Sequence, residues 1–252
     1  SGTVSVVSAA SLASSMWIEP AVVSVGQRFT VKMSVSNTGS QAANAVAALN
    51  YAGTGSGSAT YVSGPVPVST GIAGLGNAGF EWVYEATGAG AYTASAQARG
   101  YDSVLGTTIT ASSVSTYVTI ETGAALTSSL SALPVQVSTG QEITVVLAVT
   151  NSGTADAVNV TAAAPGISGS GSVVAVATPA AQTIAGGTAA HFVWRYVAQT
   201  AGNVVFTTSA AGTDENGLWP VTTGTVTSNN VIIQRAAELT ASVVAAPAPV
   251  EM

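Results

Sequence analysis

The sequence predicts an all-β chain built of two β-sandwich domains in series, with an extra strand at each end. Three observations support this fold class. The chain repeats itself with a period of about 113 residues. Apolar and polar residues alternate over short runs, which is the pattern of half-buried strands. Stretches rich in Gly, Asn and Ser separate these runs and favour turns, and no segment carries a helical stripe with start and stop signals.

The repeat is clearest in two motifs. FTVKMSVSNTGSQAAN at residues 29–44 matches ITVVLAVTNSGTADAV at 143–158. FEWVY at 80–84 matches FVWRY at 192–196. Small changes of offset between motifs are expected where loops differ in length between fixed strands. A repeat of this length is the size of one domain, so each copy is predicted to bury a core of its own.

The repeat divides the chain into two whole units and two part units. Residues 11–123 and 124–236 are the whole units. Residues 1–10 align with the last strand of each whole unit, and residues 237–252 align with the first strand. We therefore expect the chain to begin in the last strand of a preceding repeat and to stop in the first strand of a following one.

Each whole unit is predicted to open on an alternating strand, at residues 12–18 and 126–132. A proline ends this strand in both copies, Pro20 in the first and Pro134 in the second. Proline removes a backbone donor, so it is tolerated at a sheet edge or where a strand changes sheets. The first strand is therefore expected at an edge or at a switch between sheets.

A longer alternating strand follows a Gly-Gln turn, at residues 29–35 and 143–149. It leads into Asn-Thr-Gly at Asn37 in the first copy and Asn-Ser-Gly at Asn151 in the second. Asn and Gly accept a positive φ at low cost. The pattern predicts a tight turn with left-handed residues at this place.

An aromatic strand comes next in each unit. Its apolar residues share one face, and they are Phe80, Trp82 and Tyr84 in the first copy and Phe192, Trp194 and Tyr196 in the second. The repeated tryptophans could stack on a sugar. A Trp between two other aromatic residues on one face is more typical of the inner layer of a sandwich, and we favour that interpretation.

Two further strands complete each unit. Alternating runs are found at residues 92–98 and 204–210, and short apolar strands at 118–120 and 231–233. About seven short strands in a hundred-odd residues are typical of an immunoglobulin-like sandwich. We therefore predict two immunoglobulin-like domains.

The conserved spacing between the two copies resembles a known class of repeat. The pattern PxxVSxGQxxTVxxxVxNxG, followed by FxWxY and GxxxxxxxAxGxD, resembles the tandem immunoglobulin-like repeats of large bacterial surface and secreted proteins. It is similar to the CARDB type, a cell-adhesion-related domain found in bacteria, over nearly the whole chain. The resemblance implies a spacer, stalk or adhesive module, and it brings no shared catalytic residues.

Charge excludes several classes of partner. Only 6% of the residues are charged, and the net charge is −6 with five Lys and Arg residues. No basic patch is available for nucleic acid or for an anionic membrane surface. No apolar run is long enough to span a bilayer, so membrane insertion is not expected. The absence of cysteine leaves the cellular compartment open.

The residue types that carry chemistry are scarce. His191 is the single histidine and is not repeated, so no Ser/His/Asp or Cys/His arrangement is supported. We expect no enzyme, no cofactor and no metal site. Asp102 and Asp214 repeat in a loop, and GTDENG at 212–217 invites a calcium site, but it lacks the regular Asp spacing of a calcium loop. A turn-forming Asp is the preferred interpretation.

The end strands are the predicted contact sites between units. Val4 and Val6 at one end, and Leu239, Ala241 and Val243 at the other, each present one apolar face. Such strands associate unless they are paired. They belong to neighbouring repeats of a longer array, or they pair with other copies of the chain. Both hypotheses predict a non-catalytic extracellular structural protein, a repeat unit of a bacterial surface stalk or filament.

An alternative function is adhesion or carbohydrate binding through loop aromatic residues at the cell surface. Trp17 and Trp219 are not repeated, and Tyr51 and Tyr61 lie near each other in sequence. Exposed aromatic rings that gather at one end of a domain would favour this alternative. The sequence does not identify a surface ligand.

Overall fold

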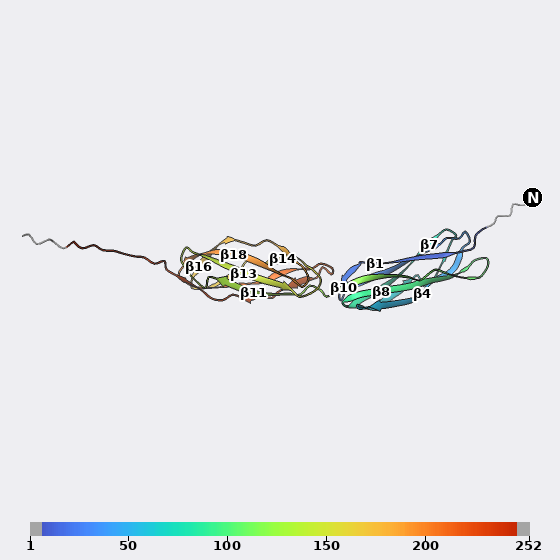
Figure 1. Cartoon of the computed structure of the whole chain (residues 1–252), viewed down its shortest axis with the longest axis horizontal. Coiled ribbons are helices and arrows are strands. Elements are labelled where there is room, and N and C mark those ends of the chain that lie inside the picture. The colour runs from blue at the N-terminus through green and yellow to red at the C-terminus, as the bar shows by residue number, and fades with distance from the viewer. Residues whose placement is uncertain (1–6, 246–252) are drawn as a thin grey trace, which may run out of the picture.

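The protein is all-β, as the sequence predicts, in a computed structural model that describes residues 7–245. No helix occurs in this range, and hence none that could cross a membrane. The strands form two sandwiches that lie end to end along the longest axis of the molecule (Figure 1). We call them unit 1, from β1 to β10, and unit 2, from β11 to β23.

Unit 1 holds ten strands in two sheets. They are β1 (Leu12–Glu19), β2 (Val22–Ser24), β3 (Arg28–Asn37), β4 (Ala43–Gly55), β5 (Ser58–Val66), β6 (Thr70–Ile72), β7 (Asn77–Gly88), β8 (Gly90–Asp102), β9 (Thr108–Thr110) and β10 (Val114–Glu121). One sheet has the order β1-β3-β7-β5 and the other β2-β10-β8-β4-β6, with β9 paired to β8.

Unit 2 repeats this plan with more interruptions. Its strands are β11 (Leu126–Leu133), β12 (Gln136–Ser138), β13 (Glu142–Asn151), β14 (Ala157–Ala162), β15 (Gly166–Gly169), β16 (Ser172–Ala177), β17 (Gln182–Ile184), β18 (Ala189–Thr200), β19 (Gly202–Thr208), β20 (Ala210–Asp214), β21 (Pro220–Thr222), β22 (Val226–Thr227) and β23 (Val231–Gln234). The order β11-β13-β18-β16 matches the first sheet of unit 1. The opposite layer is split into β12-β23-β19-β15 and β17-β14-β20-β21.

The predicted prolines mark where the chain changes sheets. β1 lies at the edge of one sheet, and beyond Pro20 the chain enters β2 of the other sheet, parallel to β10. Beyond Pro134 the chain does the same, because β12 pairs in parallel with β23. The prediction of an edge strand that switches sheets is confirmed in both units.

Each unit has its own core, filled by the alternating faces. Phe29, Val31, Met33 and Val35 on β3 are fully buried, and their counterparts on β13 are as well. Trp82 and Trp194 are also buried, which confirms the interpretation as inner-layer residues. Strand pairing leaves one face of each strand for the core, so the period of two decides burial.

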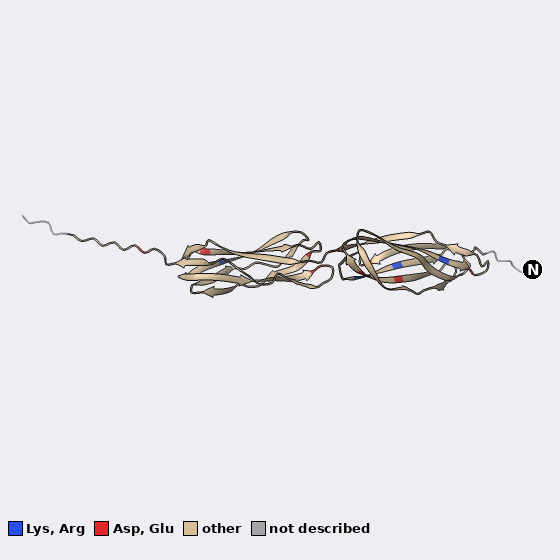
Figure 2. Cartoon of the chain, turned by 90° about the horizontal axis from the view of Figure 1, so that it is seen from below, with Lys and Arg blue, Asp and Glu red and all other residues tan. Residues whose placement is uncertain are grey.

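Charged residues are sparse along the strands (Figure 2). Three ion pairs lie on the first sheets of the two units: Lys32 with Glu19 at 2.5 Å, Arg28 with Glu85 at 3.7 Å and Arg195 with Glu142 at 3.9 Å. Five of these six side chains are exposed and Lys32 is half-buried, so solvent screens the pairs and each contributes little to the stability of the fold. Apolar burial, rather than charge pairing, dominates the stability of the units.

Substitutions in unit 2 test which of its leucine side chains belong to the core. Leu147→Ala removes a fully buried side chain, and we expect a loss of about 2–5 kcal/mol in the free energy of unfolding, measured by urea denaturation. Leu133→Ala is the matched control, because this leucine is exposed and its loss should change stability by about 0.5 kcal/mol or less. Equal effects of the two substitutions would contradict the placement of the core.

Candidate functional site at the junction of the two units

The linker between the units is bound by side chains of unit 2. Residues 122–125 run from β10 to β11 without forming a strand. The Ala124 N–H donates to Oδ2 of Asp214 at 2.7 Å, and the Ala125 N–H donates to Oδ1 of Asn151 at 3.0 Å. Both acceptors are buried. The linker is therefore fixed by two buried side chains that satisfy its backbone donors.

Asn151 joins three segments through one side chain. Its Oδ1 also accepts from the Gly153 N–H at 3.1 Å. Its Nδ2 donates to the carbonyls of Ala155 at 2.9 Å and Ile184 at 3.1 Å. Because the side chain is fully buried and fully bonded, it ties the linker to the turn after β13 and to β17.

Two threonine residues exchange hydrogen bonds at the start of the linker and hold it to unit 2. The Thr122 N–H donates to Oγ1 of Thr154 at 2.8 Å, and the Thr154 N–H donates to Oγ1 of Thr122 at 2.9 Å. In unit 1 the same exchange links Ser8 and Ser40, at 2.8 and 2.9 Å. The equivalent positions thus hold a matched pair in both units.

Unit 1 binds residues 8–11 as unit 2 binds the linker. The Ala10 N–H donates to Oδ2 of Asp102 at 2.7 Å, and the Ser11 N–H donates to Oδ1 of Asn37 at 3.1 Å. We call these acceptors the linker sockets: Asn37, Ser40 and Asp102 in unit 1, and Asn151, Thr154 and Asp214 in unit 2. Each unit therefore carries a socket for the segment that precedes its first strand.

The glycine of the Asn-x-Gly turn is needed because another segment of the backbone lies against it, and not because its φ angle is positive. Gly39 and Gly153 do not have a left-handed φ, so the predicted reason for these glycines was wrong. A Cβ on Gly39 would overlap the carbonyl of Ala9, and a Cβ on Gly153 would overlap that of Gly123. Only glycine lets the segment in the socket lie against the turn.

The repeated aspartates form turns, as predicted, and also hold the linker, which the sequence analysis missed. Oδ1 of Asp102 accepts from the N–H groups of Val104 and Leu105, both at 2.8 Å. The backbone N–H of Leu105, followed by those of Ala10 and Val104, lowers the pKa of Asp102. Charge-assisted bonds of this kind favour the ionised carboxylate. The repetition of Asp at equivalent positions, 102 and 214, was the available signal.

Unit 2 also contacts unit 1 directly. The Ser24 hydroxyl at the end of β2 donates to the two carboxylate oxygens of Asp214 at 3.0 and 3.2 Å. Nδ2 of Asn216 donates to Oε2 of Glu121 at 2.7 Å and to the Ser24 hydroxyl at 3.3 Å. One loop of unit 2 thus binds both the linker and the adjoining end of unit 1.

Trp219 covers this contact from the side. A Cβ placed on Gly26 of unit 1 would lie 3.5 Å from Cη2 of Trp219, so the ring lies over the turn after β2. A Cβ on Gly217 would come within 2.9 Å of the same ring. Glycine at 217 therefore leaves the room that the indole occupies. Trp219 remains 43% exposed beside the contact.

The other candidate aromatic residues lie on strands and do not gather at one end. Trp17 lies on β1 and Tyr61 on β5, at opposite edges of one sheet, and both are exposed. Tyr51 is packed against the core and stacks on Tyr84 with ring centroids 5.3 Å apart, so it is not an exposed ring of the kind that adhesion would need. These rings do not form a common sugar-binding platform.

The predicted end contacts fall partly outside the described residues. Val4 and Val6 lie outside them. Leu239 and Val243 are 97% and 96% exposed, and Ala241 is exposed too. No strand is formed between residue 235 and the end of the described range at 245. The apolar side chains of this tail are therefore accessible.

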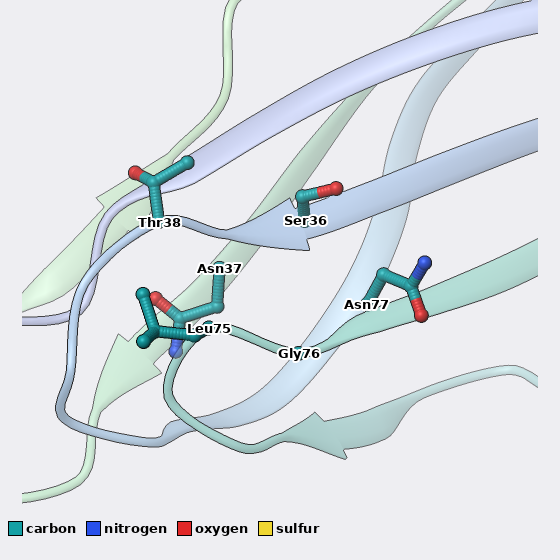
Figure 3. Close-up of a pocket in the computed structure, with 6 residues that line it drawn as sticks. All are labelled: Ser36, Asn37, Thr38, Leu75, Gly76 and Asn77. Carbon is teal, nitrogen blue, oxygen red and sulfur yellow. The ribbon is translucent and has the colours of Figure 1, made fainter.

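Candidate catalytic and metal sites are few. His191 is exposed on β18, opposite Ala148 of β13. Among residues 7–245 no group of three or more His, Asp or Glu side chains is placed to hold a metal ion. An open hollow of about 410 Å³ lies beside the socket of unit 1 (Figure 3). It is lined by Ser36, Asn37, Thr38, Leu75, Gly76 and Asn77, none of which is titratable.

No protein-family model and no curated protein matches the chain. Among solved structures, a protein of unknown function from Porphyromonas gingivalis W83 is similar with 11% identity, a TM-score of 0.31 and coverage of 84% of this chain and 98% of that one. Escherichia coli alpha-2-macroglobulin has 15% identity and a TM-score of 0.35. The match covers 88% of this chain and 17% of the macroglobulin.

The E. coli adhesin FdeC is also similar, with 12% identity and a TM-score of 0.33. The match covers 91% of this chain and 66% of the adhesin structure. This chain thus spans less than a quarter of the macroglobulin and about two thirds of the adhesin structure. Similarities at these scores carry no argument about function.

The socket carboxylate predicts a pH dependence of unit 1. The folded state lowers the pKa of Asp102, so the stabilisation is complete above the ordinary carboxyl pKa of about 4 and is lost as pH falls through the lowered value. We expect the thermal midpoint of the wild type to fall on acidification below that pH. Asp102→Asn should have a lower midpoint at neutral pH and a shallower acid slope. The same acid slope in both proteins would contradict this role.

Proposed function

We propose that this chain is a non-catalytic extracellular structural protein, a repeat segment of a bacterial surface stalk or filament. The observation that carries the proposal is the pair of equivalent linker sockets. Each unit binds the segment before its first strand with the same buried Asn and Asp acceptors. Units joined in this way are held at a fixed spacing, which is what a stalk requires of its repeats.

The surface supports the same proposal. Charged residues make up 6% of the chain, so neighbouring strands of a stalk or fibre repel each other little. The aromatic rings that would favour carbohydrate binding lie at opposite sheet edges of unit 1 and at a separate place in unit 2. Rigid spacing of another module, or assembly into a fibre, therefore fits the molecule better than recognition of a sugar.

The end segments are proposed as contacts with neighbouring units. Leu239, Ala241 and Val243 keep the apolar alternation of a first strand and are exposed. Val4 and Val6 are proposed to act in the same way at the other end. The partner is an adjacent repeat or another copy of the chain.

The tail contacts have a simple test. Replacing Leu239 and Val243 together by Asp places two charges on the apolar face of the tail, and we expect any assembly seen by light scattering to be lost. Thr240→Asp is the control, because this residue belongs to the other face of the alternation. Assembly that survives the double substitution would remove the tail from the mechanism.

The stalk proposal predicts a rigid junction. Spin labels on Tyr117→Cys and Val174→Cys, both at exposed positions, report the distance between units in a chain that has no native cysteine. We expect a narrow distance distribution in the otherwise native chain. Adding Ser24→Ala and Asn216→Ala should broaden it about twofold, because the direct contacts between units are removed.

Asn230→Ala is the control for this experiment, since Asn230 is exposed in unit 2 and its side chain takes no part in the junction contacts. It should leave the distribution unchanged. A distribution that is already broad with the native junction would overturn rigid spacing, and the proposed function with it.

A further inference from the structure

The loop after β20 contains the one Asn-Gly pair of the sequence, Asn216-Gly217. Such a pair is chemically labile, because glycine has no Cβ to hinder attack of its backbone nitrogen on the side-chain amide of the preceding asparagine. Unit 1 has Val104 and Leu105 at the equivalent positions, so it has no amide there to react. The labile pair therefore belongs to the junction and is not a general feature of the repeat.

Packing at the junction requires the glycine of this pair. A Cβ on Gly217 would come within 2.9 Å of the Trp219 ring. The same ring lies over the turn of unit 1 at Gly26. A larger residue at position 217 would therefore displace the indole from unit 1. The residue that makes the pair labile is thus the one that lets the two units fit together.

The two groups that would react are both held by hydrogen bonds. The Gly217 N–H donates to Oδ1 of Asp214 at 2.7 Å. Nδ2 of Asn216 donates to Oε2 of Glu121 at 2.7 Å and to the Ser24 hydroxyl at 3.3 Å. Attack of the glycine nitrogen on the amide carbon requires the N–H to leave its acceptor and the amide to turn. The closed junction therefore hinders the reaction.

The bonds of the amide cross from one unit to the other. Asn216 belongs to unit 2, whereas both of its acceptors, Glu121 and Ser24, belong to unit 1. Separation of the units at this contact releases the amide, and only the bond from Gly217 to Asp214 inside the loop remains. The lability of the pair is therefore coupled to whether the junction is closed.

We propose that Asn216-Gly217 is a one-way latch, which is protected while the junction is closed and deamidates once the junction opens. The Gly217 nitrogen attacks Cγ of Asn216, its proton passes to Nδ2, and the Cγ–Nδ2 bond breaks with loss of ammonia. Water then adds to the five-membered imide and opens it, which leaves aspartate or isoaspartate at position 216. Water is the only co-reactant, and no group is oxidised or reduced.

The product does not restore the closed junction. It carries a carboxylate in place of the amide that donates to Glu121. The carboxylate of Asp214 is bonded to the same Ser24 hydroxyl as the amide, so the new charge lies beside two carboxylates. Like charges at this distance repel each other. The latch rests on the proposed function, because a stalk passes any pull along its length through the contact between its units (Figure 1).

Deamidation rates in the full-length chain test the protection. Conversion at position 216 is followed at mildly alkaline pH by peptide mass spectrometry, as a gain of about 1 Da. Ser24→Ala with Glu121→Ala removes both acceptors of the amide and leaves the labile pair intact. We expect conversion about ten times faster in this double variant than in the native chain. Glu81→Ala is the matched control, because it removes the same charge from an exposed position on β7 and should leave the rate unchanged.

The urea-denatured chain gives the rate without protection, and we expect it to convert at least as fast as the double variant. If the denatured chain converts and the double variant is no faster than the native chain, the latch is overturned. A denatured chain that does not convert overturns it as well, because the pair is then not labile.

Asn216→Asp tests the effect of the product, because it places the new carboxylate in the chain directly. With spin labels on Tyr117→Cys and Val174→Cys, we expect this substitution to broaden the distance distribution between units about twofold. Asn230→Asp is the matched control, since it adds the same charge at an exposed position of unit 2. A distribution that stays narrow in Asn216→Asp overturns the latch and leaves the stalk proposal standing. A broad distribution in the native chain instead overturns the proposed function.

Discussion

The backbone donors of the linker are the constraint on which the junction depends. Residues 122–125 and 8–11 enter a unit without pairing in a sheet, so their N–H groups need other acceptors once they are buried. An unsatisfied buried donor costs about 1–3 kcal/mol, which is a large share of the stability of one domain. Asn151 and Asp214 in unit 2, and Asn37 and Asp102 in unit 1, supply these acceptors.

The same side chains set the relation between the units. The carboxylate of Asp214 accepts from the linker, from its own turn through Gly217 and from Ser24 of unit 1. A group bound from three segments cannot move toward one without losing another, and bonds in such a network strengthen each other. The orientation of one unit relative to the next therefore follows from the hydrogen bonds that the linker donors make. Ion pairs at the surface contribute little to this orientation.

The sequence allowed the layers of the sandwich to be predicted, because the period of two along a strand decides which side chains face the core. Phe29 and Trp194 are buried for this reason, and Pro20 marks a change of sheet. The junction was not predicted, because Asp214 and Ala124 lie 90 residues apart and no local pattern brings them together. Tyr51 shows the same limit, since its ring packs on an aromatic strand far along the chain.

The ends of the two units that carry the linker sockets combine a constant part with a variable part. The socket keeps Asn and Asp in both units, because any entering segment presents the same backbone donors. The loop after the socket aspartate differs between the units. Unit 2 has Gly217 and Trp219 in this loop, and unit 1 has Leu105 and Thr107 at the equivalent positions. The bulky side chain has moved from one of these two positions to the other. The backbone donors thus determine how a segment enters a unit. The loop after the socket aspartate can vary, so it can distinguish one neighbouring unit from another.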